Sequence, residues 1–266
     1  MRYLFPSIIL FVIFSSCSFN GSFYYTRSPY EEKEFPNSRE VCLANSEGRK
    51  LYGILLQTPA ETIKGYILLI HGNGGNAPGW AENALPLQKA GYDVLVFDWQ
   101  GYGKSEGSPT HKNVVDDTEL FLQYLLERNK GKKAVLWGES LGANLSVYIA
   151  YRNPETVCCM ILEAGFSNHN EIAIDMMPGI IKPLAWILVK SPFKSDKLIK
   201  EVKTPVMIIH STEDEVVPYR MGQELYENAA GPKEFWEITG AHCRGMSLFE
   251  KEYIERFNKW VKKHGQ

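Results

Sequence analysis

The sequence lacks an excess of charge of either sign. Its 266 residues include 29 Lys and Arg against 31 Asp and Glu, which gives a net charge of −2. Nucleic-acid-binding domains usually present a basic surface, so this balance argues against nucleic acid as a partner. Internal repeats, heptad runs and low-complexity tracts are also absent from the sequence. With 44% hydrophobic and 23% charged residues, the chain is long enough for one large α/β domain or two small ones.

The five cysteines provide neither a disulfide framework nor a zinc site. If Cys17 is modified, the spacing of Cys42, Cys158, Cys159 and Cys243 suggests no set of bridges. The adjacent pair lies in a predicted buried strand, where neighbouring side chains face opposite ways, and is interpreted as small core residues. No cysteine and histidine spacing is typical of zinc, so we expect no metal.

The N-terminus has no apolar run long enough to span a membrane. A basic start and an apolar run over residues 3–14 precede two serines and Cys17, and the run is shorter than the roughly 20 residues that a membrane-spanning helix needs. The segment resembles a bacterial lipoprotein signal, although Phe14 stands where Leu is usual. The resemblance implies a signal over residues 1–17, lipidation of Cys17, and an exported protein anchored to a membrane of the bacterial cell envelope. A plain cleavable signal or an uncleaved anchor is the alternative, and residues 18–37 would be a tether.

From residue 38 to residue 266, strand and helix patterns alternate. Strands are predicted over 40–44, 50–57, 65–70, 92–97, 133–137, 157–162, 205–209 and 233–238, and helices over 80–89, 114–129, 143–150, 219–228 and 247–262. Such alternation predicts an α/β domain with a mostly parallel sheet of about eight strands covered by helices. The first two strands could form an antiparallel pair.

Residues 168–202 interrupt this alternation. They contain no predicted strand and are rich in apolar residues, including Met176, Met177 and Trp186. This stretch is predicted to be a helical cap insertion of about 35 residues. It could simply pack on the domain, or it could be a lid whose apolar face lines an acyl-binding pocket.

The segment Gly138–Gly142 has the pattern G-x-S-x-G. A predicted strand precedes it and a predicted helix follows it, so Ser140 would lie on a sharp strand-to-helix turn with its hydroxyl exposed. The flanking glycines allow such a turn, because a side chain would crowd the crossing of strand and helix. Ser140 is therefore the candidate nucleophile, and the backbone N–H of Leu141 is a candidate donor to an oxyanion.

A serine hydroxyl needs a base, and the base needs an orienting carboxylate. His242 follows the last predicted strand, and Glu213, Asp214 and Glu215 follow the strand before it. The order serine, acid, histidine is that of the α/β-hydrolases. Chemistry alone leaves the choice among the three carboxylates open.

Three further segments resemble motifs of the α/β-hydrolase superfamily. The pattern Asp214, Val217, Pro218 matches D-x-x-V-P, and His71-Gly72-Asn73 resembles the HG-x oxyanion loop. Residues 98–107 resemble D-x-R-G-x-G-x-S-x-G, except that Gln100 replaces the arginine. Together the motifs cover roughly residues 64–245, and the chain looks most similar to the serine aminopeptidase-like, or monoacylglycerol lipase-like, branch.

This resemblance implies the residues of a catalytic site and a reaction class. Asp214 would orient His242, and Asn73 would be the second oxyanion donor beside Leu141. The expected function is hydrolysis of a carboxylic ester or thioester of a small acyl substrate through an acyl-enzyme on Ser140, without metal or organic cofactor. Amide or peptide hydrolysis and a non-catalytic envelope binding protein are the alternatives. The sequence specifies neither the acyl chain length nor the oligomeric state.

Overall fold

One mixed sheet organises the chain. The computed structural model describes residues 24–26, 28–176, 189, 191 and 193–265. The strands are β1 (Ser38–Ala44), β2 (Lys50–Leu56), β3 (Gly65–Ile70), β4 (Tyr92–Phe97), β5 (Ala134–Glu139), β6 (Val157–Glu163), β7 (Val206–Ser211) and β8 (Lys233–Ile238). Their order in the sheet is β1-β2-β4-β3-β5-β6-β7-β8. The β1–β2 and β2–β4 pairs are antiparallel and the others parallel, so the predicted fold class is confirmed.

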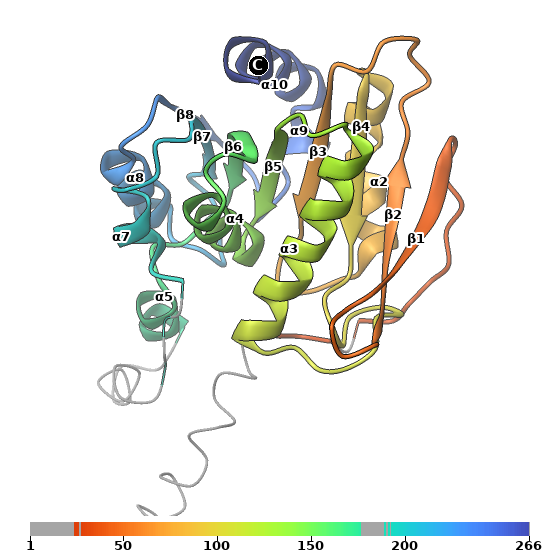
Figure 1. Cartoon of the computed structure of the whole chain (residues 1–266). Helices are drawn as coiled ribbons and strands as arrows, with labels where there is room; N and C mark the ends of the chain where they lie inside the picture. The colour runs from red at the N-terminus through yellow and green to blue at the C-terminus, as the bar shows by residue number, and fades with distance from the viewer. Residues whose placement is uncertain (1–23, 27, 177–188, 190, 192, 266) are drawn as a thin grey trace, which may run out of the picture.

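Helices cover both faces of this sheet. They are α2 (Ala77–Lys89), α3 (His111–Arg128), α4 (Leu141–Arg152), α5 (His169–Met176), α7 (Ser195–Leu198), α8 (Tyr219–Asn228), α9 (Gly245–Leu248) and α10 (Glu250–His264). Helices α3, α4 and α8 pack in one apolar cluster, and α2 and α10 pack in the other on the opposite face. Figure 1 shows α3 and α4 in front of the sheet with α2 behind it.

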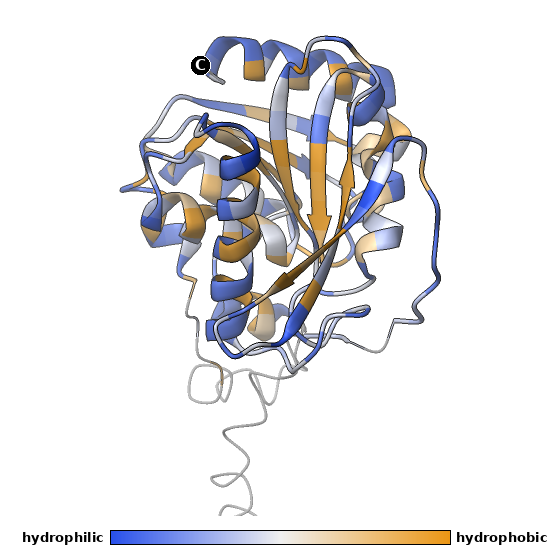
Figure 2. Cartoon of the chain, turned by 45° about the vertical axis from the view of Figure 1, so that its right-hand side comes forward, coloured by the Kyte–Doolittle hydropathy of each residue, from blue (hydrophilic) through white to orange (hydrophobic). Residues whose placement is uncertain are grey.

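The strands in the middle of the sheet are apolar on both faces. All residues of β4, β5, β6 and β7 are buried, which is expected for parallel strands with helices on either side. Figure 2 shows these strands as hydrophobic while the outward faces of the helices are hydrophilic. The catalytic candidates follow such strands, so a rigid core holds their positions.

Several helix boundaries differ from the sequence prediction, with α3 beginning three residues and α4 two residues earlier than predicted. Helix α2 begins at Ala77 rather than at residue 80, because Pro78 is tolerated in a first turn where its missing N–H is not needed. The predicted helix 247–262 is in fact α9 and α10, which are separated at Phe249. The short α9 continues directly from the loop that carries His242.

Residues 24–26 and 28–37, part of the predicted tether, lie against the domain, and we call them the N-terminal strap. Tyr24 is buried, Ser28 accepts a hydrogen bond from the Gly75 amide, and Lys33 pairs with Glu82 on α2. The strap therefore follows the rim of the loop between β3 and α2.

Two predictions concern segments that the structure does not describe. Cys17 and the rest of the predicted signal lie outside the described residues. The predicted cap insertion begins with α5 and ends with α7, but residues 177–188, with Met177 and Trp186, also lie outside them. None of the described helices combines the length and apolarity needed to cross a membrane.

Candidate active site

Ser140 occupies the turn between β5 and α4 in a strained backbone conformation. Its φ of 55° and ψ of −115° are rare for a residue with a side chain, and such strain costs on the order of 1–3 kcal/mol and persists only where surrounding structure imposes it. The flanking glycines are what make the turn possible. A Cβ on Gly138 would lie 2.4 Å from Ser146 Oγ, and one on Gly142 would lie 1.9 Å from the Ile70 carbonyl oxygen.

His242 and Asp214 form a close hydrogen-bonded pair. The Nδ1 atom of His242 lies 2.8 Å from Asp214 Oδ2 and 3.0 Å from Oδ1. Asp214 Oδ1 also accepts the amides of Val216 and Val217. Burial alone would raise the pKa of Asp214, but the hydrogen bond from His242 and these amides outweigh it and lower that pKa. The carboxylate therefore stays ionised and can hold the imidazole in one orientation.

The structure distinguishes among the three consecutive carboxylates. Glu213 accepts the Gly240 amide and Glu215 accepts the His242 amide, both from the exposed side of the loop. Asp214 is the one whose carboxylate meets the imidazole. Behind it lies the buried His210, with Nε2 at 3.6 Å from Asp214 Oδ2 and hydrogen-bonded to the Val217 carbonyl. The sequence analysis did not identify His210, because it lies inside a strand.

The predicted oxyanion loop passes beside the nucleophile. A Cβ placed on Gly72 would lie 3.4 Å from both Ser140 Cβ and Trp80 Cζ2. Asn73 is held by its side chain, whose Oδ1 accepts the Tyr25 amide at 2.7 Å and the Tyr102 hydroxyl at 3.1 Å. Leu141 is the first residue of α4, where backbone N–H groups have no partner within the helix. Both predicted donors thus belong to segments that border Ser140.

Beneath this loop lies a buried histidine–carboxylate pair. The Nδ1–H of His71 donates to the Gly72 carbonyl oxygen at 2.7 Å, and burial lowers the pKa of His71 to about 4. Its Nε2 atom is 3.8 Å from Asp98 Oδ1, which accepts the Ala77 amide. Burial raises the pKa of Asp98 to about 7. This pair supports the loop and the start of α2, in keeping with the structural roles that the sequence motifs imply.

Known proteins are similar to this chain in sequence. A sequence profile described as the alpha/beta hydrolase fold matches residues 65–187. The Escherichia coli K12 protein YfhR is 28% identical over 233 residues, covering 85% of this chain and 80% of YfhR. The lysophosphatidylserine lipase ABHD12 of Danio rerio is 31% identical over 184 residues, covering 63% of this chain and 48% of the lipase.

Solved structures show the same fold. An esterase of Pyrococcus furiosus, Pf2001, superposes with a TM-score of 0.71 at 20% identity, covering 91% of this chain and 98% of the esterase. The monoacylglycerol lipase of Paleococcus ferrophilus gives a TM-score of 0.61 at 20% identity, covering 80% and 99% respectively. The chain has the α/β-hydrolase fold.

The chain departs from the α/β-hydrolase motif at Gln100, and the structure shows what this residue contacts. The Gln100 side chain donates to Asp117 Oδ1 and its backbone N–H to Asp117 Oδ2. Arg49, next to β2, donates to the Gln100 side-chain oxygen. Gln100 therefore links the guanidinium of Arg49, the residue before β2, to the Asp117 carboxylate on α3.

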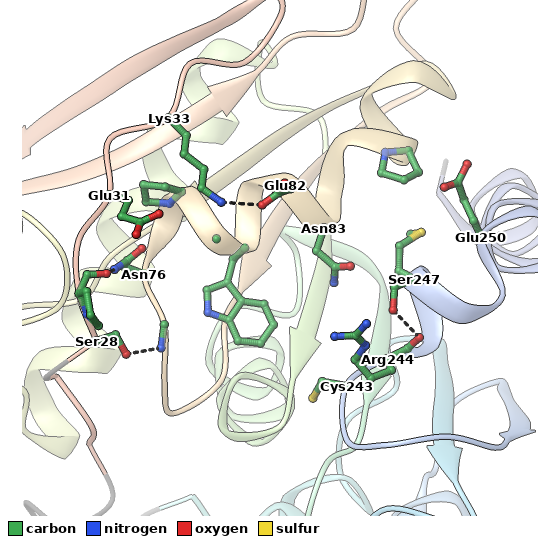
Figure 3. A pocket seen from close by; sticks show the side chains of 17 residues that line it. Ser28, Glu31, Lys33, Asn76, Glu82, Asn83, Cys243, Arg244, Ser247 and Glu250 are labelled. Atoms are coloured by element: carbon green, nitrogen blue, oxygen red, sulfur yellow. Dashed lines mark hydrogen bonds and ion pairs between the residues drawn. The ribbon is translucent and has the colours of Figure 1, made fainter.

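The protein has a wide groove of about 730 Å³ beside the oxyanion loop, and both polar and apolar residues line it, the latter including Trp80, Met246 and three prolines. Figure 3 shows it between α2, the segment that follows His242, and the strap. Its walls carry Ser28, Glu31, Lys33, Gly75, Asn76, Trp80, Glu82, Asn83, Cys243, Arg244, Ser247 and Glu250. Lys33 pairs with Glu82, while Arg244 has no ion pair among the described residues. Ser140, Asp214 and His242 do not line the groove, but Trp80 does, and a Cβ on Gly72 would lie 3.4 Å from both Trp80 and Ser140, so the Gly72 backbone separates the groove from the nucleophile.

Two buried carboxylates near Ser140 were not predicted as site residues. Glu139 is the variable residue before the serine, and Glu163 is the last residue of β6. A glutamate at the end of an otherwise apolar strand is the signal that could have identified Glu163. No group of three or more His, Cys, Asp or Glu side chains in the described part of the chain could hold a metal ion.

Proposed function

We propose that this protein is a serine hydrolase that cleaves carboxylic esters or thioesters through an acyl-enzyme on Ser140. The observation that carries the proposal is the strained serine turn together with the close Asp214–His242 pair at the same end of the sheet. A serine on such a turn needs a base, and a base that is oriented by a buried carboxylate is what the fold supplies.

In the proposed reaction Ser140 Oγ attacks the acyl carbon while His242 Nε2 takes its proton. Asp214 holds the Nδ1–H and stabilises the imidazolium. The amides of Asn73 and Leu141 would bind the oxyanion. His242 then gives the proton to the leaving group, and a water molecule activated by His242 releases the acid and restores Ser140.

We assign the leaving group to the groove beside the oxyanion loop. Beside apolar surface from Trp80, Met246 and three prolines, this groove carries carboxylates, amides and Arg244, which has no ion pair among the described residues. These polar groups lose hydration without compensation against a hydrocarbon chain but can hydrogen-bond a polar one. A leaving group with hydroxyl or charged groups suits it better than a hydrocarbon. The names of similar proteins, an esterase, a monoacylglycerol lipase and a lysophosphatidylserine lipase, support an ester with a polar leaving group.

The first experiment is labelling with a fluorophosphonate probe, which reacts with activated serines. The full chain should be labelled and Ser140→Ala should not; equal labelling of both would reject the proposal. Hydrolysis of p-nitrophenyl acyl esters and acyl thioesters is then compared with that of aminoacyl anilides. A preference for the anilides would favour amide hydrolysis, and no turnover of any substrate would favour a binding protein.

We further propose that the protein is exported and anchored to a bacterial envelope membrane through lipid on Cys17. The support is the sequence pattern of its first residues, since several acyl chains hold a protein firmly to a bilayer. Cys17→Ser should release the protein into the soluble fraction and abolish incorporation of labelled palmitate. Retention of the label in this variant would contradict the proposal.

A further inference from the structure

A pair of buried carboxylates lies directly behind the candidate catalytic residues. Glu139 precedes Ser140 at the end of β5, and Glu163 stands opposite it in the register of β5 with β6. The exposed fractions of these residues are 0% and 2%. Glutamates are almost never fully buried unless they are paired or hydrogen-bonded, so this arrangement requires partners that compensate for the lost hydration.

The carboxylate of Glu163 is fastened to the loop that carries His242. Its Oε1 atom accepts the Gly245 amide at 2.7 Å, and its Oε2 atom accepts the Tyr253 hydroxyl at 3.0 Å. Gly245 follows His242 by three residues, and a Cβ there would lie 2.8 Å from Glu163 Oε1. The close approach of this amide to the carboxylate therefore depends on glycine.

Glu139 meets the same loop from its other side. Its Oε1 atom accepts a hydrogen bond from Asn83 Nδ2 at 3.2 Å, and the thiol of Cys243 interacts with its carboxylate. Cys243, the residue after His242, has a φ of 53°, so the loop is strained where it turns toward the pair. In Figure 3 Asn83 projects from α2 and Cys243 from the opposite wall of the groove.

Two carboxylates this close in a water-free interior cannot both be ionised. Burial, followed by the charge of Glu163, raises the pKa of Glu139 well above its ordinary value. Burial also raises the pKa of Glu163, but the Gly245 amide, Tyr253 and the charge of His242 oppose that rise. Glu163 accepts two hydrogen bonds, from the Gly245 amide and the Tyr253 hydroxyl, whereas Glu139 accepts one from an N–H group, that of Asn83. We therefore assign the negative charge of the pair to Glu163 and the proton to Glu139.

The titratable groups around Glu163 come from four parts of the fold. They are Glu139 on β5, Asp214 after β7, His242 and Cys243 on the loop after β8, and Tyr253 on α10. Of these, His242 is the group whose charge changes during the proposed reaction. A positive imidazolium there lowers the energy of an ionised Glu163, and by the same interaction an ionised Glu163 stabilises the imidazolium.

We propose that Glu163 is a positioning residue that holds the His242 loop through Gly245 and stabilises the imidazolium with its negative charge, while Glu139 keeps the shared proton. This proposal rests on the proposed function. The proton that leaves Ser140 Oγ moves to His242 Nε2 and then to the leaving group. The carboxylate pair neither gains nor loses a proton in the cycle.

The test is the pH dependence of fluorophosphonate labelling of the full chain, which needs no knowledge of the substrate. Glu163→Gln keeps an oxygen that can accept the Gly245 amide but removes the charge. We expect the acid limb of its rate profile to move to lower pH by about one unit, because the imidazolium loses a nearby carboxylate. The plateau rate should fall by roughly tenfold, the equivalent of one pKa unit.

Two matched variants separate the charge from the scaffold. Glu139→Gln replaces a protonated, neutral acid with a neutral amide, so its acid limb should stay where that of the unmodified protein lies, unlike that of Glu163→Gln. Glu255→Gln removes an exposed carboxylate from α10, and its profile should coincide with that of the unmodified protein because solvent screens that charge. If Glu163→Gln does not fold, Tyr253→Phe can replace it in the test. This variant removes the hydroxyl that donates to Glu163 and so destabilises ionised Glu163, and the acid limb of its rate profile should move to lower pH.

A slower Glu163→Gln whose acid limb stays in place would overturn the inference, because that result would mean a purely structural role. An acid limb that moves to lower pH in Glu139→Gln and not in Glu163→Gln would also overturn it, because the charge would then reside on Glu139. Failure of the proposed function would give a different result. The unmodified protein would then not be labelled at Ser140 at any pH, and the inference would fall with it.

Discussion

Asp214 is one of three consecutive carboxylates whose partners differ. Its own oxygens meet the His242 imidazole and the amides of Val216 and Val217, whereas Glu213 and Glu215 accept backbone amides of the same loop. An ionised group orients the imidazole and stabilises its charged form, but an acceptor of a backbone amide only shapes the loop.

This difference predicts how the three positions respond to substitution. Asp214→Asn should lower kcat on the order of ten-thousand-fold, because an amide favours the wrong imidazole tautomer and lacks the charge. Glu213→Gln should lose far less, since its exposed side chain is replaced by one that still accepts the Gly240 amide. Steady-state kinetics with a p-nitrophenyl ester would measure both. Equal losses in the two variants would contradict the assigned roles.

The N-terminal strap connects an element outside the sheet to the oxyanion loop. The Tyr25 amide donates to Asn73, the Gly75 amide donates to Ser28, and Asn76 donates to the Pro29 carbonyl. From the other side the Tyr102 hydroxyl donates to the Asn73 side chain. These bonds hold the loop in place. We expect them to affect catalysis because a donor to an oxyanion must be positioned precisely.

Removing one of these bonds should therefore reduce kcat more than it changes KM. Tyr102→Phe should lower kcat by about fivefold, which corresponds to roughly 1 kcal/mol for one hydrogen bond. Tyr124→Phe is the matched control, because that hydroxyl accepts from Arg39 on the far side of α3 and should leave kcat unchanged. Measuring kcat and KM of both variants with one ester would test this prediction. An increase in KM alone for Tyr102→Phe would show that the loop binds substrate instead.

Local sequence patterns predicted most of the helices and strands. They did not predict the long-range contacts between them. The serine turn, the alternation of strands and helices, and the order of Ser140, Asp214 and His242 are visible within short segments. The packing of the strap on residues 73–76 and the Glu163–Gly245 bond join positions tens of residues apart. Periodicity describes one segment at a time, so it cannot show which distant segment a buried polar group meets.

On the scale of the whole molecule, three separate segments meet at a cluster of aromatic rings. Tyr24 of the strap hydrogen-bonds His111 at the start of α3. The His111 ring contacts that of His169 at the start of α5, which also contacts Phe166 and Phe193. Burial lowers the pKa of His169 to about 3, so the folded protein holds this ring neutral at neutral pH. The cluster therefore connects strap, domain and cap through an uncharged histidine.

This burial predicts a specific loss of stability in acid. An unfolded histidine takes up a proton near pH 6.5 whereas folded His169 does not until about pH 3, so the unfolded state binds more protons and stability falls as pH decreases between them. His169→Phe removes this titration but retains an aromatic ring. Urea unfolding should show that the free energy of unfolding of the unmodified protein, relative to His169→Phe, decreases by about 2 kcal/mol from pH 7 to pH 5. Above pH 7 the difference between the two proteins should be constant, because His169 is neutral in both states there. A difference that stays constant down to pH 5 would mean that His169 is hydrated in the folded protein, and that the cluster does not exclude water.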